Sequence, residues 1–153
     1  FGVLWVGLIF YRNLSCAKVF QSGMMPALSD EDFQAIYNYN EREVRDKVKA
    51  GDIVYYRRSI GAEKNKFYFG RVIATEGQQV AMVNGEVLVN DKPLPETYVG
   101  KDSRNPAEFF TGIVVPKDHY FIANDNRAAN YAKDSRSFGP VSVHAILGKA
   151  TSR

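Results

Sequence analysis

The stretch Gln79–Val89 reads QVAMVNGEVLV and decides the class of fold. Two alternating apolar runs flank Asn84-Gly85, as expected for half-buried strands. Asn-Gly suits a two-residue hairpin turn, because both turn positions need a positive φ angle. We therefore predict a β-hairpin with strands over Gln79–Val83 and Glu86–Val89, in a chain built mainly from strands.

Further segments are rich in β-branched and aromatic residues and are separated by Gly, Pro, Asn and Asp. Such segments are typical of short strands joined by turns. The other predicted strands are Ala17–Gln21, Phe33–Asn38, Asp52–Arg57, Phe67–Ala74, Gly112–Val115, Tyr120–Ala123 and Ile146–Lys149. Between Leu94 and Gly112 the chain has two prolines and little periodicity, so we predict a long surface connection there.

One stretch combines two patterns. Ser29 and Asp32 resemble a helix capping box, whereas the residues that follow alternate over Phe33–Asn38 as in a strand. We predict the strand first and then a short charged helix over Glu41–Lys49, which Gly51 ends. The alternating charges of this helix are typical of a solvated face, and we assign them no function.

Composition excludes several classes of protein. The chain has 153 residues, of which 45% are hydrophobic and 24% charged, which suits one packed domain and excludes general disorder. The lone Cys16 excludes an internal disulfide, and with two histidines it leaves too few ligands for a structural zinc site. We therefore expect neither a metal nor another cofactor.

The charge balance gives little support for nucleic-acid binding. Lys and Arg outnumber Asp and Glu by only 20 to 17, a net charge of +3. Tyr55–Tyr68 mixes basic and aromatic residues as single-strand binders do, but Glu63 interrupts it. We predict no nucleic-acid partner.

The first residues, Phe1–Tyr11 (FGVLWVGLIFY), carry no charge and are followed by Arg12. Spanning a bilayer takes about 20 apolar residues, so this segment alone is too short. Trp5, Tyr11 and Arg12 are residue types found at membrane interfaces. The segment fits either the end of a transmembrane helix or a buried core element. We divide the chain into an apolar membrane-proximal segment, residues 1–15, and a β domain, residues 16–153.

Four short patterns follow one another along the rest of the chain. They are GMMPAL at 23–28, GDIV at 51–54, GRVI at 70–73 followed by Gly77, and DNR at 125–127 with DSR at 134–136 and GPV at 139–141. Together they resemble bacterial type I signal peptidases, membrane-anchored serine proteases with a Ser-Lys dyad on a mainly β fold. The resemblance covers about residues 20–150, and Tyr120–Arg136 is its most specific part. It implies a signal-peptidase-like β fold with hairpins, a short helix and a long surface loop.

The resemblance places both catalytic positions of the family on glycines. The nucleophilic serine directly precedes Met-x-Pro, which is Gly23 here, and the general-base lysine directly precedes Arg-Val-Ile, which is Gly70 here. A Ser-Lys peptidase needs a hydroxyl and a neutral amine within about 3 Å of each other. Glycine supplies neither group, so we predict a protein without peptidase activity. The alternative is an active peptidase that uses Ser22 with Lys66 or Lys64 to trim exported precursors.

The last motif also departs from the family. Asn124 stands where the family usually has glycine before Asp-Asn-Arg, and no residue of AANYAKD matches the serine that helps to position the lysine. The remaining charged and polar motif residues are interpreted as a structural ion-pair network beside the site. They are Arg71, Asp125, Asn126, Arg127, Asp134, Ser135 and Arg136.

The family binds an extended signal peptide beside β-strands, so the resemblance implies a binding groove at Ser22, Met24, Met25 and Pro26. The two methionines fit either the rim of a binding groove or an ordinary hydrophobic core. Some signal-peptidase-like proteins encoded with pili in Gram-positive bacteria lack the dyad and assist sortase-linked pilus assembly, and this sequence resembles them in kind. The expected partner is a secreted or pilus subunit protein, with a sortase as a second candidate. The expected location is the extracytoplasmic face of the cell membrane, with a single-pass anchor.

Overall fold

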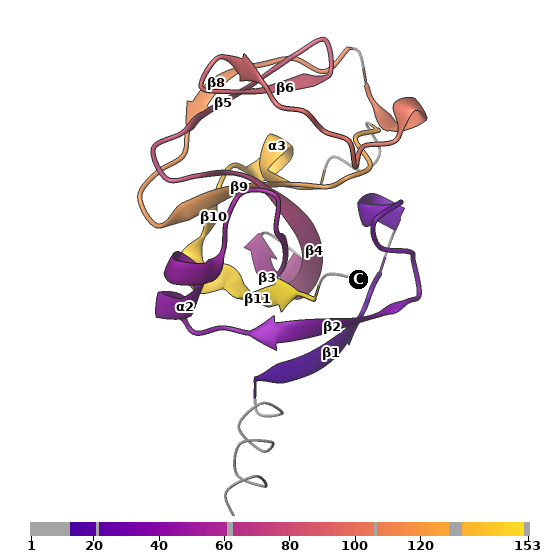
Figure 1. The fold of residues 1–153 in the computed structure, drawn as a ribbon, viewed down its shortest axis with the longest axis vertical. Helices are drawn as coiled ribbons and strands as arrows, with labels where there is room; N and C mark the ends of the chain where they lie inside the picture. The colour runs from indigo at the N-terminus through magenta and orange to yellow at the C-terminus, as the bar shows by residue number, and fades with distance from the viewer. Residues whose placement is uncertain (1–12, 21, 61–62, 106, 129–132, 152–153) are drawn as a thin grey trace, which may run out of the picture.

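The computed structural model describes residues 13–20, 22–60, 63–105, 107–128 and 133–151. The predicted apolar segment at residues 1–11 lies outside them. Among the described residues, no helix has the length and apolar character needed to cross a bilayer. The described strands form two antiparallel sheets, seen one above the other in Figure 1, so the prediction of a mainly β fold is confirmed.

The lower sheet in Figure 1 has the strand order β1-β2-β11-β3-β4-β9-β10, and the upper sheet has the order β7-β6-β5-β8. The strands of the lower sheet are β1 (Leu14–Lys18), β2 (Phe33–Asn38), β3 (Ile53–Ile60), β4 (Glu63–Thr75), β9 (His119–Ala123), β10 (Val141–Ser142) and β11 (Ile146–Ala150). Those of the upper sheet are β5 (Gln79–Val83), β6 (Glu86–Val89), β7 (Lys92–Pro93) and β8 (Phe110–Val114). Short helices connect them: α2 (Glu41–Lys47), α3 (Ser135–Phe138) and the 3-10 turns η1 (Ser22–Met24), η2 (Lys101–Ser103) and η4 (Val143–Ala145).

The hairpin prediction is confirmed. Strands β5 and β6 pair in the expected register, and Asn84 and Gly85 have φ angles of 52° and 76°. The first predicted strand, over 17–21, is wrong in position, because β1 ends at Lys18. The Val19 N–H instead donates to the Asp32 carbonyl, and the chain then enters η1, where Met24 is buried. The strand thus ends three residues earlier than predicted, and η1 follows the end of the predicted range.

Helix α2 begins with a capping box. The Asn40 side chain accepts a hydrogen bond from the Glu43 N–H at 3.0 Å, and the Glu43 carboxylate accepts one from the Asn40 N–H at 3.1 Å. The helix ends at Lys47, two residues before the predicted end, because Val48 is extended and its side chain is buried. Gly51 lies in the turn beyond, with a φ angle of 94°.

Loss of this cap has a defined expected effect. Asn40→Ala removes the acceptor for one orphan N–H of the helix, so it should lower the free energy of unfolding by about 1 kcal/mol. Asn40→Ser keeps a capping oxygen and should retain most of that stability. Urea unfolding of the two variants checks the expectation, and equal losses in both would contradict it.

The core is divided among three groups of side chains. Between the two sheets, Phe121 of β9 packs against Val80 of β5, and the Phe110 ring stacks on Phe121 with ring centroids 5.8 Å apart. On another side, Val44 of α2 packs with strand residues such as Tyr56. The third group lies under η1 and contains Val19, Met24, Leu28, Ile36, Phe69 and Ala150. Because this third group holds η1 against β4, it positions the candidate site.

Candidate functional site

The two glycines that replace the expected dyad lie on neighbouring elements. Gly23 is buried in η1, and Gly70 is buried in β4, where it pairs with Val54 of β3. Met24 and Phe69, their chain neighbours, belong to the same core group. The Asn126 N–H donates to the Gly23 carbonyl at 2.8 Å and so joins the first motif to the last. The fold therefore brings the separate sequence motifs together.

Other side chains already fill the space beside both glycines. A Cβ atom added at Gly70 would lie 2.5 Å from Ile122 Cγ2 and 3.2 Å from Tyr56 Cε1. A Cβ atom added at Gly23 would lie 3.0 Å from Asn124 Nδ2. Contacts under 3 Å between non-bonded carbon atoms require a neighbour to move. The site is therefore packed around glycine at both positions.

The structure also places the residues of the alternative dyad. Ser22 begins η1 and is partly buried, and Lys66 lies on the exposed part of β4. Neither residue is among those that line the groove beside Gly23. The side chain of Lys64 lies outside the described part of the structure. The described residues thus bring no Ser22–Lys66 pair into this groove.

A small groove opens directly beside Gly23. Its cavity volume is about 30 Å³, and its lining is mainly apolar and aromatic, with two lysines. The lining residues are Lys18, Val19, Phe20, Gly23, Met24, Phe67, Tyr68, Phe69, Asn124 and Lys133. Met24 is 2% exposed and belongs to the core beneath, whereas Met25 is 43% exposed and Pro26 is also exposed. Of the four residues predicted to form the groove, only Met24 lines it.

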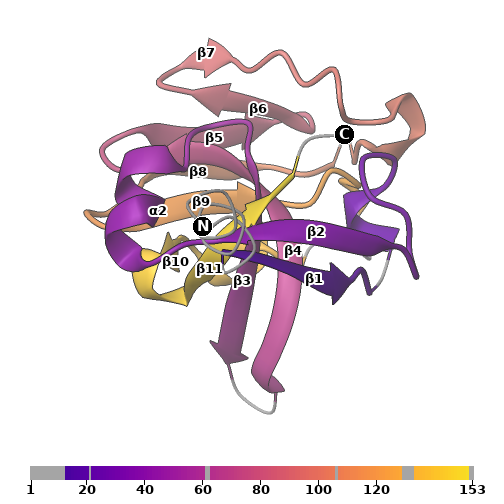
Figure 2. The same cartoon turned by 60° about the horizontal axis from the view of Figure 1, so that its bottom comes forward.

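Two strand edges border this groove. Strand β1 pairs with β2 along one edge, as Figure 2 shows, and no strand of the described residues pairs with its other edge. Strand β4 pairs with β3 through residues 67–69, but β9 pairs with β4 only from Arg71 onward. Backbone groups at an unpaired strand edge are available to a further strand. Both sides of the groove can therefore pair with an extended peptide.

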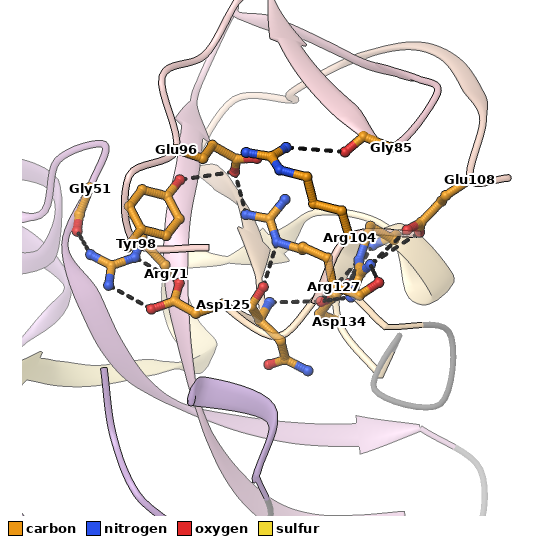
Figure 3. A network of polar contacts seen from close by, with 12 residues as sticks. Gly51, Arg71, Gly85, Glu96, Tyr98, Arg104, Glu108, Asp125, Arg127 and Asp134 are labelled. Atoms are coloured by element: carbon orange, nitrogen blue, oxygen red, sulfur yellow. Dashed lines mark hydrogen bonds and ion pairs between the residues drawn. The ribbon is translucent and has the colours of Figure 1, made fainter. Parts of the chain in front are cut away.

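Arg71 and Asp125 form a buried ion pair on the other side of the motif (Figure 3). Arg71 Nε donates to Asp125 Oδ1 at 2.8 Å and Nη2 donates to Oδ2 at 2.6 Å, while Nη1 donates to the Gly51 carbonyl at 2.8 Å. The Tyr98 ring lies 4.1 Å from the guanidinium carbon. Burial raises the pKa of the Asp125 carboxyl, and the hydrogen bonds from Arg71 oppose that rise. The pair joins the motifs at 51–54, 70–73 and 125–127.

Arg127 is paired with a residue that the motifs do not contain. Arg127 Nη2 donates to Glu96 Oε1 at 2.5 Å, and both side chains are almost completely buried. The Tyr98 hydroxyl donates to the same Glu96 oxygen at 3.0 Å, and Arg104 lies 3.6 Å from the other one. Burial and the Glu96 charge raise the pKa of Tyr98 above its usual range, so the phenol stays a donor. Glu96 is thus the centre of this second cluster, as Figure 3 shows.

Arg136, in α3, forms the third part of the ion-pair network. Its guanidinium makes a double contact with Asp134, at 2.9 Å from Nε to Oδ1 and 2.8 Å from Nη2 to Oδ2, and Nη1 donates to Glu108 at 2.9 Å. Asp134 also accepts from the Asn124 N–H at 2.7 Å. The Ser135 hydroxyl oxygen accepts from the Ile122 N–H at 2.9 Å. These bonds hold the backbone of residues 122–124 beside both glycines.

The sequence analysis did not identify the side chains between Leu94 and Gly112 that pair with the charged residues of the motifs. The prediction of a plain surface connection is wrong for its buried part, because Glu96 and Val99 are 6% and 7% exposed. Glu96, Tyr98 and Glu108 reach from this segment to Arg127, Arg71 and Arg136 respectively, and Arg104 lies beside Glu96. No local periodicity marks them. The sequence signal for them is that the motifs contain more arginines than aspartates. A buried cluster of these residues therefore needs carboxylates from elsewhere in the chain.

No residue set in the described ranges suggests a metal centre, since none groups three or more His, Cys, Asp or Glu side chains suitably. The charged residues of the site are instead paired with each other.

Comparison with known proteins agrees with this geometry. The family model described as "Signal peptidase, peptidase S26" matches residues 1–153. The chain is 30% identical over 139 residues to the inactive signal peptidase IA of Staphylococcus aureus, a match that covers 82% of this chain and 75% of that protein. It is 29% identical over 160 residues to thylakoidal processing peptidase 1 of Arabidopsis thaliana, of which it spans only 46%. The crystal structure of a signal peptidase I from Enterococcus faecalis is similar with a TM-score of 0.56 and 25% identity, covering 69% of this chain and 97% of that one.

Proposed function

The chain belongs to the signal peptidase family S26, and from this premise we propose that it is a non-catalytic member that binds an extended segment of a secreted partner. One observation carries the proposal. Glycine stands at both dyad positions, while a groove lies beside Gly23 between two strand edges.

The chemistry of the family supports the absence of cleavage. A serine attacks the peptide carbonyl only when a neighbouring base accepts its proton, and neither group exists on glycine. Removing one member of such a unit costs nearly as much rate as removing all of them. The relative in Staphylococcus aureus is named an inactive signal peptidase, which supports the same proposal.

The form of the groove supports binding. An extended peptide between β1 and β4 would pair with strand edges, so the backbone would provide much of the affinity. Val19, Met24 and Phe69 form an apolar floor, and the small cavity beside Gly23 favours a small side chain at that point. The exposed rings of Phe20 and Phe67 provide further apolar contact at the rim.

Incubation of the purified protein with a fluorescent signal-peptide-like precursor peptide tests the proposal. We expect bound peptide by fluorescence anisotropy and no cleavage product by mass spectrometry. Phe67→Glu should weaken binding, because Phe67 lines the groove, and Phe109→Glu is a matched control, since this exposed ring does not line it. Cleavage that Ser22→Ala abolishes would overturn the non-catalytic role, and failure to bind would overturn the binding role.

We propose further that the protein acts at the extracytoplasmic face of the cell membrane, with the apolar segment at 1–11 as part of its anchor. The proposed partner is a secreted protein such as a pilus subunit, and a sortase would join the subunits. Crosslinking from position 67 in the native cell envelope, followed by mass spectrometry, identifies what the groove binds. Capture of a cytoplasmic protein alone would overturn this assignment.

A further inference from the structure

Asn124 lies beside Gly23, the position in the groove at which the family has its nucleophile. It lines the groove together with Gly23, and its Nδ2 atom would be 3.0 Å from a Cβ atom at that glycine. A serine side chain and the present Asn124 side chain would therefore compete for the same space. Any side chain at position 23 would contact the Asn124 carboxamide.

The surrounding network holds Asn124 in a fixed position. Its N–H donates to the buried Asp134 carboxylate at 2.7 Å, and its carbonyl accepts from Arg127 Nε at 2.5 Å. The Asn126 N–H donates to the Gly23 carbonyl at 2.8 Å, which keeps η1 beside this segment. Asn124 is 9% exposed, so its side chain has little freedom except toward the groove. Ligand-binding groups need this kind of support to keep a productive geometry.

The chemistry of the side chain matches that of a peptide backbone. A carboxamide offers two N–H donors and an oxygen that accepts two hydrogen bonds, so it can bond to several groups at once. An extended peptide between β1 and β4 presents its own N–H and C=O groups to the floor of the groove. A carboxamide can bond to either group, whichever faces it.

We propose that Asn124 is a peptide-binding residue, whose carboxamide hydrogen-bonds one backbone amide of the extended segment at the former cleavage position. This inference rests on the proposed function of the groove. It assigns to Asn124 the role of holding a peptide bond at the point where a peptidase would cut it.

An ester scan of the peptide tests this hydrogen bond. A short alanine-rich, fluorescently labelled peptide is made in versions that each replace one backbone amide by an ester, which removes the N–H and weakens the carbonyl as an acceptor. For the wild-type protein, we expect one ester position to weaken binding about fivefold, as for the loss of one hydrogen bond. In Asn124→Ala the same ester should bind as well as the all-amide peptide.

Matched variants separate the hydrogen bond from a change of structure. Asn105→Ala removes a carboxamide in the segment between β7 and β8 that does not line the groove, and its ester profile should equal that of wild type. Asn124→Asp keeps the shape but loses the N–H donors, and it should change the profile at the same position only. An identical profile in wild type and Asn124→Ala would overturn the role of Asn124 while the groove itself stands. Absence of binding to the all-amide peptide would overturn the proposed function and this inference together.

Discussion

Glu96→Gln is expected to lower the free energy of unfolding by about 3–5 kcal/mol, the cost of leaving a buried charge without its partner. The Glu96 carboxylate accepts hydrogen bonds from Arg127 and Tyr98, and its side chain is completely buried. A neutral amide of the same shape would leave the buried Arg127 guanidinium uncompensated. Since a domain is stable by only about 5–15 kcal/mol, the variant should be close to unfolding at room temperature.

Urea unfolding followed by circular dichroism measures this loss. Asp46→Asn is the matched control, because Asp46 pairs with Arg42 at 3.8 Å on the exposed face of α2. Exposed pairs of this kind contribute about 0–1 kcal/mol, so the control should change little. Similar unfolding midpoints for the two variants would show that the buried network does not stabilise the fold.

The second large effect concerns Gly70. Gly70→Ala should lower the free energy of unfolding by about 1–3 kcal/mol, because the new Cβ atom would lie 2.5 Å from Ile122 Cγ2. Gly70→Lys should be worse, since it adds a charged chain to the same packed space. The double variant Gly23→Ser/Gly70→Lys is therefore expected to show no cleavage of a precursor peptide.

A change at Ile122 distinguishes this clash from other causes. Ile122→Leu removes the branch at Cβ with nearly the same volume, so Gly70→Ala/Ile122→Leu should recover much of the lost stability. Ile122→Val keeps the branch and should not rescue Gly70→Ala. Equal behaviour of the two double variants would contradict the proposed contact. Measurable cleavage by Gly23→Ser/Gly70→Lys would show instead that the site opens readily.

Local patterns were sufficient for much of the fold. The Asn84-Gly85 hairpin depends on the φ angles of two adjacent residues, and these are properties of the residue types themselves. Strand β2 also follows from short-range alternation, and α2 begins at Glu41 as predicted. The capping box that begins it is formed by Asn40 and Glu43, whereas the pair Ser29 and Asp32 named from the sequence lies before β2 and starts no helix. The end of α2 was misplaced, because burial of Val48 in the core decided it rather than Gly51.

The order of motifs along the chain was also sufficient to place glycine at both dyad positions and Asn124 before Asp-Asn-Arg. These are facts of residue identity, which need no coordinates. They predicted the absence of a hydroxyl and an amine, but they contained no information on what fills the vacated space.

Only the tertiary structure decided that question, and the reason is physical. Ile122 and Asn124 reach positions 70 and 23 across a strand pairing and a turn, and Glu96 reaches Arg127 from a segment without periodicity. Contacts between residues far apart in the chain depend on how the sheets pack, whereas turns and caps depend on neighbours. The sequence by itself therefore determined that glycine stands at both expected dyad positions and which turns form. The packing of β4, β9 and η1 decided that Ile122 and Asn124 lie against positions 70 and 23, and that Asn124 lines the groove beside Gly23.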